Sequence, residues 1–147
     1  MSDNDSVLND LLEKQCYVID FLPRQVSKDA NGQFFKIENF LLNNYERYGL
    51  RDRFIRTLLK LMCYYRVIIH WGEWIEQPTR ELIAEIVDTI MENHSGYMNM
   101  LLPDKNALLV FEWDCLNLTL YNPDAELIEL AEQLAQSEGL FCRKPEA

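Results

Sequence analysis

The chain has 147 residues, 48% of them hydrophobic, with five Gly, five Pro and a formal net charge of -10. This length and composition predict one folded domain, residues 1–147, and exclude collagen-like and low-complexity classes. The acidic charge disfavours nucleic acid as a partner, because binding to phosphates depends on Lys and Arg.

Residues 1–9 are polar and acidic, and they lack the basic start and apolar run of a secretory signal peptide. The apolar runs are shorter than the roughly 20 residues that a membrane-spanning helix needs. We therefore expect a cytoplasmic protein without a membrane role.

Its cysteines lack the C-x-x-C spacing of zinc or redox sites, which predicts reduced, mostly buried thiols. They are Cys16, Cys63, Cys115 and Cys142.

The N-terminal third alternates helical and strand patterns. Apolar spacing predicts a short amphipathic helix over residues 7–14 that covers the core, and residues 17–22 predict a strand that Pro23 ends. A second helix is predicted from an apolar stripe that Gly49 closes as its C-cap. The stripe consists of Phe34, Ile37, Leu41 and Tyr45, with Phe40 beside it.

The middle of the chain predicts two further helices around an ambiguous segment. The first has an apolar face and an opposite basic face that is interpreted as solvated. Its apolar residues are Phe54, Leu58, Met62 and Tyr65, and its basic ones are Arg53, Arg56 and Lys60. Residues 67–74 mix strand formers with Gly72, so strand and loop both stay open. Pro78 and Thr79 then begin a helix whose buried face runs from Leu82 to Met91.

The C-terminal third predicts a three-stranded meander and a helix. Residues 98–102 and 107–113 should pair across a turn, and Leu116, Leu118 and Leu120 share one face of the next strand. Asn122 is expected to cap the last helix, with Pro123 in its first turn and Gly139 at its end. A short strand over residues 140–143 could pair with residues 17–22. The predicted class is α+β: a mostly antiparallel sheet of three to five strands with helices mainly on one face.

No catalytic motif is present, and the chain has only two histidines. His70 and His94 could form a Cys/His dyad with Cys63 or Cys115, or a metal site with Glu112 and Asp114, only if the fold brought them together. His94 is expected to cap a helix end. The turn at residues 112–115 is interpreted as an ordinary one, with a small acidic binding site as the alternative. We predict no cofactor and no metal, and we favour a binding protein over an enzyme.

Two groups of side chains are candidates for binding a partner. Trp71 and Trp74, with Tyr65 nearby, belong to an aromatic-rich segment of the kind that anchors protein interfaces, although such residues also fill cores. Glu126, Glu129 and Glu132 form an acidic helix face, which either is simply solvated or attracts a cationic partner.

The stretch FEWDCLNLTLYNP at residues 111–123, continued by SEGLFCRKP at residues 137–145, resembles the C-terminal part of small acidic bacterial proteins. Some proteins of that kind resemble immunity proteins, which bind and silence a toxin. The resemblance implies a protein partner and carries no individual functional residue.

Three functions follow from these patterns. The favoured one is a non-catalytic acidic domain that binds a protein, such as an immunity protein that neutralises a basic toxin. The first alternative is a small enzyme or ligand-binding domain with a pocket near Trp71, Trp74 and Trp113. The second is a homodimer that uses the aromatic segment as its interface.

Overall fold

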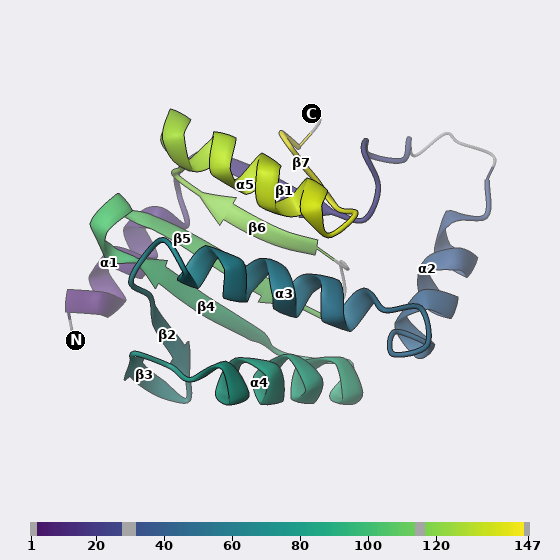
Figure 1. Ribbon diagram of the computed structural model, residues 1–147, viewed down its shortest axis with the longest axis horizontal. Helices are drawn as coiled ribbons and strands as arrows, with labels where there is room; N and C mark the ends of the chain where they lie inside the picture. Colours follow the sequence, from purple (N-terminus) through teal and green to yellow (C-terminus); the bar gives the residue numbers. More distant parts are fainter. Residues whose placement is uncertain (1–2, 28–31, 114–116, 146–147) are drawn as a thin grey trace.

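One antiparallel sheet of seven strands, in the order β3-β2-β4-β5-β6-β1-β7, organises the chain (Figure 1). The computed structural model describes residues 3–27, 32–113 and 117–145. Its strands are β1 (Cys16–Asp20), β2 (Ile68–Trp71), β3 (Glu73–Glu76), β4 (Tyr97–Leu102), β5 (Ala107–Glu112), β6 (Asn117–Tyr121) and β7 (Phe141–Arg143). Its helices are α1 (Asp3–Leu11), α2 (Phe34–Asn43), α3 (Leu50–Met62), α4 (Arg80–Asn93) and α5 (Ala125–Ser137), with a short 3-10 turn at Pro103–Lys105.

The α+β class is confirmed, but the sheet is larger than the three to five strands expected. The meander of β4, β5 and β6 is present, and β7 pairs with β1 as predicted. The additional strands come from the ambiguous segment, which forms the β2–β3 hairpin. Gly72 turns this hairpin with a φ of 76°, a conformation that other residues rarely adopt.

The helices α3, α4 and α5 cover one face of the sheet and enclose the main core (Figure 1). We call the opposite face the rear face. There α1 covers a second, smaller core through Leu8 and Leu11, which agrees with the expected covering role of this helix. Because β4 and β5 lie in the middle of the sheet and are buried on both faces, they read as continuous apolar runs. The strand β6 alternates, and its buried residues are Leu118 and Leu120, as predicted.

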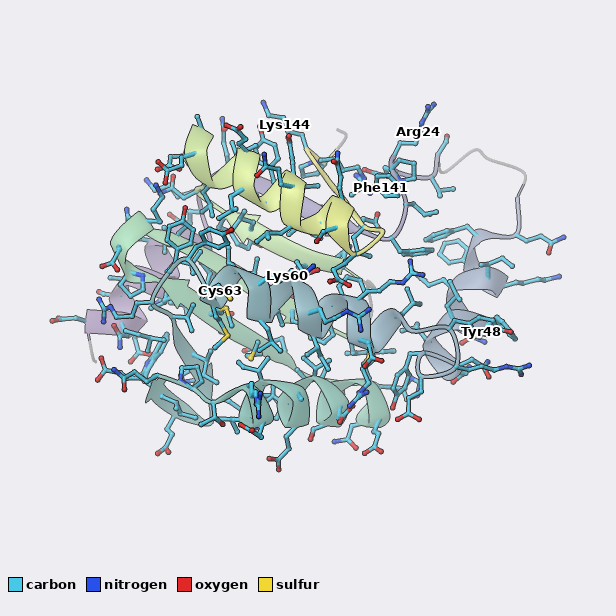
Figure 2. The ribbon with its side chains drawn as sticks, viewed as in Figure 1. Arg24, Tyr48, Lys60, Cys63, Phe141 and Lys144 are labelled. Atoms are coloured by element: carbon cyan, nitrogen blue, oxygen red, sulfur yellow. The ribbon has the colours of Figure 1, made fainter. Side chains whose placement is uncertain are left out.

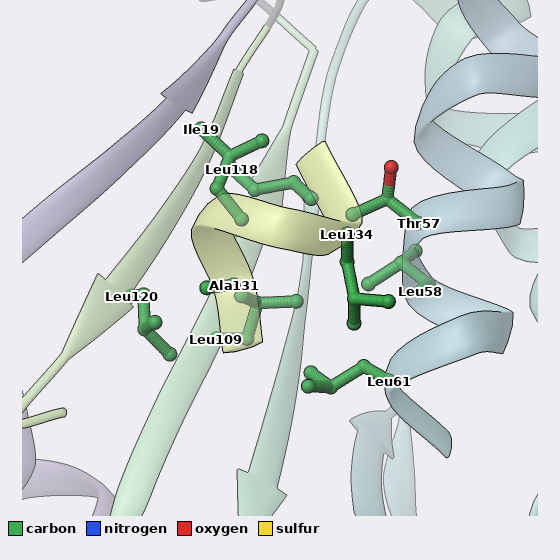
Figure 3. Close-up of a pocket in the computed structure, with 9 residues that line it drawn as sticks. All are labelled: Ile19, Thr57, Leu58, Leu61, Leu109, Leu118, Leu120, Ala131 and Leu134. Atoms are coloured by element: carbon green, nitrogen blue, oxygen red, sulfur yellow. The ribbon is translucent and has the colours of Figure 1, made fainter. Parts of the chain in front are cut away.

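Packing in the main core is close under α5. A gap of about 10 Å³ remains between α3, α5 and the strands β1, β5 and β6 (Figure 3). Its lining is apolar apart from Thr57, whose hydroxyl donates to the Arg53 carbonyl at 2.8 Å. A space of this size holds about one water molecule, so it is a packing defect and not a binding site.

The helix termini differ from three of the predictions. Asp124, not Asn122, caps α5, and its carboxylate accepts a hydrogen bond from the Leu127 N–H at 2.8 Å. At the start of α4 the cap is Thr79, so Pro78 precedes the helix. Gly49, with a φ of 73°, is the N-cap of α3 and not the C-cap of α2, which already ends at Asn43. Each predicted signal lay near a real helix terminus. At α4 and α5 a neighbouring residue is the cap, whereas Gly49 is a cap itself, but of the following helix.

The basic face of α3 is not simply solvated, which corrects the sequence interpretation. Arg56 Nε and Lys60 Nζ each lie 2.7 Å from a carboxylate oxygen of Glu138, at the end of α5. The Glu138 side chain is only 7% exposed. Burial raises the pKa of its carboxyl group, but the hydrogen bonds from Lys60 and Arg56 outweigh burial and leave the pKa below its usual value. This ion pair joins the two helices.

Replacing Glu138 with Gln should lower the free energy of unfolding by about 1–2 kcal/mol at pH 7, because the two cations lose a charged acceptor. The folded-state pKa of Glu138 is depressed, so its contribution is present above the unfolded pKa of about 4.3 and is lost as the pH falls through the folded pKa. Urea unfolding of the wild type and of Glu138→Gln between pH 7 and pH 3 measures how their difference in free energy of unfolding depends on pH. Glu129→Gln is the control, and a difference that stays constant over this range would contradict the ion pair.

Candidate functional site

The predicted aromatic residues do not form one surface. Trp71 packs against the main core, whereas Trp74 packs against the second core on the rear face and donates from its indole N–H to Asp5 of α1 at 2.9 Å. Tyr65 also packs against the main core, and its hydroxyl lies 3.3 Å from Glu126. All three side chains are half-buried.

The alternative prediction of a pocket near the tryptophans stays a prediction, although Trp71 and Trp74 lie on opposite faces of the sheet. Trp71 lines an open hollow of about 380 Å³ together with His70, Gly72, Gly96 and Tyr97. Trp113 instead packs against the main core and meets the ring of His94, with 5.6 Å between ring centroids.

The acidic face of α5 is exposed, as its pattern predicted. Glu126 is 76% exposed and lies 3.5 Å from Lys105, which also contacts Asp124 at 2.7 Å. Glu129 and Glu132 are exposed as well, and neither has an ion-pair partner within the described part of the chain. The carboxylates of Glu129 and Glu132 are therefore available to a partner, but they do not surround a cavity.

The histidines and cysteines take separate places. His94 is the C-cap of α4 with a φ of 52°, as expected. The ring of His70 is tilted against the ring of Trp74, with 4.7 Å between their centroids. Cys63 is exposed at the end of α3, which corrects the expectation of mostly buried thiols, whereas burial raises the pKa of Cys142 to about 12. Asp114 and Cys115 lie outside the described residues, and within the described ones no three metal-binding side chains converge.

No protein-family model, no curated protein and no solved structure matches this chain. Over residues 3–27, 32–113 and 117–145, no helix has the length and apolar character needed to cross a membrane. The two sites below are therefore defined by their geometry.

A cleft of about 340 Å³ opens where the rear face of the sheet meets residues 21–26 and the start of α2. We call it the rear-face cleft. Its floor comes from alternate residues of β1, β6 and β7, whose neighbours in sequence point into the main core. The floor residues are Val18, Asp20, Asn117 and Arg143, and the walls are Phe21, Leu22, Arg24, Gln25, Val26, Phe34, Phe35, Glu38 and Pro145.

A largely buried ion pair lies in this cleft. Arg143 Nη2 donates to Asp20 Oδ2 at 2.5 Å, and the two side chains are 16% and 10% exposed. The other carboxylate oxygen of Asp20 accepts from the Leu22 N–H at 3.4 Å. Arg143 Nε is buried, yet among the described residues it has no hydrogen-bond partner. The sequence predicted that the two strands holding these residues could pair, but it did not indicate the ion pair itself, whose partners are 123 residues apart.

The second site is on α2, which lies at the side of the sheet beyond the N-terminal end of α3 (Figure 1). None of the residues of α2 is buried. Four large side chains on or beside this helix are exposed. Phe35, at 80%, lines the rear-face cleft, and the other three are Ile37 at 50%, Phe40 at 46% and Tyr48 at 44%. We call these three side chains the α2 patch.

The rings of Phe40 and Tyr48 lie 5.4 Å apart between centroids, and the Arg47 guanidinium stands over the Tyr48 ring. Figure 2 labels Tyr48 at this side of the molecule. Ile37 belongs to the apolar stripe predicted for this helix, so its exposure corrects the expectation that the stripe is buried.

An open hollow of about 330 Å³ adjoins the α2 patch, lined by residues 43–47 and Glu92 of α4. Burial raises the pKa of Tyr45 at this hollow, and Glu92, Glu46 and Asp88 raise it further against the opposing effect of Arg51. Glu46 and Glu92 are exposed and have no ion-pair partner among the residues that the structure describes. The charged side chains that line this hollow are therefore two carboxylates, Glu46 and Glu92, and one guanidinium, Arg47.

Proposed function

We propose that this chain is a non-catalytic protein-binding domain of the bacterial cytoplasm and that the α2 patch is its contact surface. The observation that carries the proposal is the exposure of Ile37, Phe40 and Tyr48 together on and beside one helix. Single exposed apolar residues are ordinary, but a group of them with polar borders is typical of protein interfaces. Aromatic side chains are also the residues that contribute most to binding energy.

The partner that fits this surface is a protein with an apolar side chain flanked by Lys or Arg. Glu46 and Glu92 stand beside the α2 patch without cationic partners of their own among the described residues, so they can receive such charges. The net charge of -10 and the exposed acids of α5 would speed the approach of a basic protein. A basic toxin, neutralised in the manner of an immunity protein, is the partner that we favour within this class.

The test compares the proteins captured from a lysate of the native host by the wild type and by two double variants. Ile37→Ser/Phe40→Ser removes the apolar contact, and Glu46→Gln/Glu92→Gln removes the charges. We expect one basic protein to be captured by the wild type and to fall at least about tenfold with the first variant, because truncating a central contact costs about 2 kcal/mol. The charge variant should mainly slow association and weaken its salt dependence.

Two controls make this result specific. Tyr64 is 63% exposed at the end of α3, so Tyr64→Ser removes an equally exposed aromatic at another place and should leave capture unchanged. Glu126→Gln/Glu129→Gln/Glu132→Gln tests whether the α5 acids contribute to the approach of the partner. Equal capture by all variants would overturn the α2 patch as the contact surface, and a second copy of this chain as the captured protein would support a homodimer instead.

A further inference from the structure

The rear-face cleft has the size and composition of a small-molecule site. Its volume of about 340 Å³ lies within the range of roughly 300–1,000 Å³ that is usual for ligand pockets. One wall is apolar, with Phe21, Leu22 and Phe34, while the floor holds the ion pair of Asp20 and Arg143. Such a mixture of a few polar groups in an apolar cleft orients a ligand that has a polar head and an apolar body.

The hydrogen-bonding groups of the cleft favour an acceptor over a donor. Both carboxylate oxygens of Asp20 are already used, by Arg143 and by the Leu22 N–H, and Glu38 is also engaged. A guanidinium has five N–H donors, and Arg143 spends one of them on the recorded bond to Asp20. Arg24 also lines the cleft, but its side chain extends away from the molecule, so its guanidinium does not point into the cleft (Figure 2). Among the described residues, Arg143 therefore has N–H groups left for an acceptor.

We propose that the rear-face cleft binds a small amphipathic carboxylate. The carboxylate accepts hydrogen bonds from Arg143, and the apolar body lies against Phe21 and Phe34. Arginine suits this role because its planar group can hold a carboxylate through two parallel hydrogen bonds. The ligand would share Arg143 with Asp20, so the cleft should prefer a monoanion to a more highly charged group.

The experiment is a titration of the full chain, labelled with ¹⁵N, followed by amide NMR spectra. The probes are hydrocinnamate, its neutral analogue hydrocinnamyl alcohol and the cation phenethylamine. We expect hydrocinnamate to shift the amides of Val18, Leu22 and Arg143 with a dissociation constant of about millimolar order, as suits about a dozen heavy atoms. The alcohol should bind at least about tenfold more weakly, because a charge-assisted hydrogen bond is lost. Phenethylamine should cause no shifts at these positions.

Three variants locate the binding. Val18→Phe places a ring in the cleft and should abolish the shifts with every probe, whereas Arg143→Lys keeps the charge but loses the planar donors and should weaken only hydrocinnamate. Tyr64→Ser, far from the cleft lining, should change nothing. If Arg143→Lys fails to fold, the comparison of acid and alcohol on the wild type still decides.

Equal affinity for acid and alcohol, shifts confined to the α2 patch, or no shifts with hydrocinnamate would each overturn this assignment. The outcome is independent of the protein-binding proposal, because Val18 and Arg143 do not belong to the α2 patch.

Discussion

Replacing Phe54 with alanine should lower the free energy of unfolding by about 3–5 kcal/mol, the largest loss expected from a single truncation in this chain. The Phe54 side chain on α3 is fully buried, and its ring lies 6.0 Å from the ring of Phe111 on β5. It therefore joins the helix layer to the centre of the sheet. Truncation removes apolar contact area and leaves a cavity, since the surrounding side chains can only partly fill the space.

Urea unfolding at pH 7, followed by circular dichroism, measures this loss. The control is Tyr64→Ala, which truncates a ring that is 63% exposed and should change the free energy of unfolding by less than about 0.5 kcal/mol. A loss below about 1 kcal/mol for Phe54→Ala would show that the α3–sheet contact is not the centre of the core.

Replacing Asp20 with alanine should cost about 3 kcal/mol, because it leaves the guanidinium of Arg143 largely buried without its carboxylate partner. Arg143 already has one donor, Nε, that lacks a partner among the described residues, so no second group is placed to compensate.

The double variant Asp20→Ala/Arg143→Met tests whether the pair itself stabilises the fold. Removing both charges should recover most of the loss, because an apolar replacement of a buried ion pair is often as stable as the original. A double-mutant cycle from urea unfolding gives the coupling energy. Additive losses would mean that the two side chains act independently. Recovery by the double variant would instead indicate that the ion pair adds little net stability to the fold and that its role lies in the cleft.

Local patterns were sufficient for most individual elements. The turn at residues 103–106 lies between two apolar runs, and these runs became the paired strands β4 and β5. Gly139, with a φ of 73°, ends α5 as its position predicted. Such signals act over a few residues, through backbone conformation and hydrogen bonds to near neighbours, so they can be read without knowledge of the fold.

Exposure was harder to predict, because it depends on what lies opposite a residue. Ile37 and Phe40 have the spacing of a buried helix face, yet the described part of the chain leaves them 50% and 46% exposed. An indication was present in the sequence: α2 carries more apolar residues than a single core-facing stripe can hold. In contrast, Trp71 and Trp74 are three residues apart, but the hairpin at Gly72 places them on opposite faces of the sheet.

The sequence by itself determined the class of the protein, the position of most elements and its acidic character, since these depend on composition and on short-range periodicity. Only the tertiary structure decided the order of seven strands, the link from Arg56 and Lys60 to Glu138, and the approach of Arg143 to Asp20. These contacts join residues far apart in the chain, and their partners are selected by how whole helices and strands pack. The rear-face cleft depends on that packing, because its lining comes from segments far apart in the chain, whereas the α2 patch lies within one segment and depends on the packing only for its exposure.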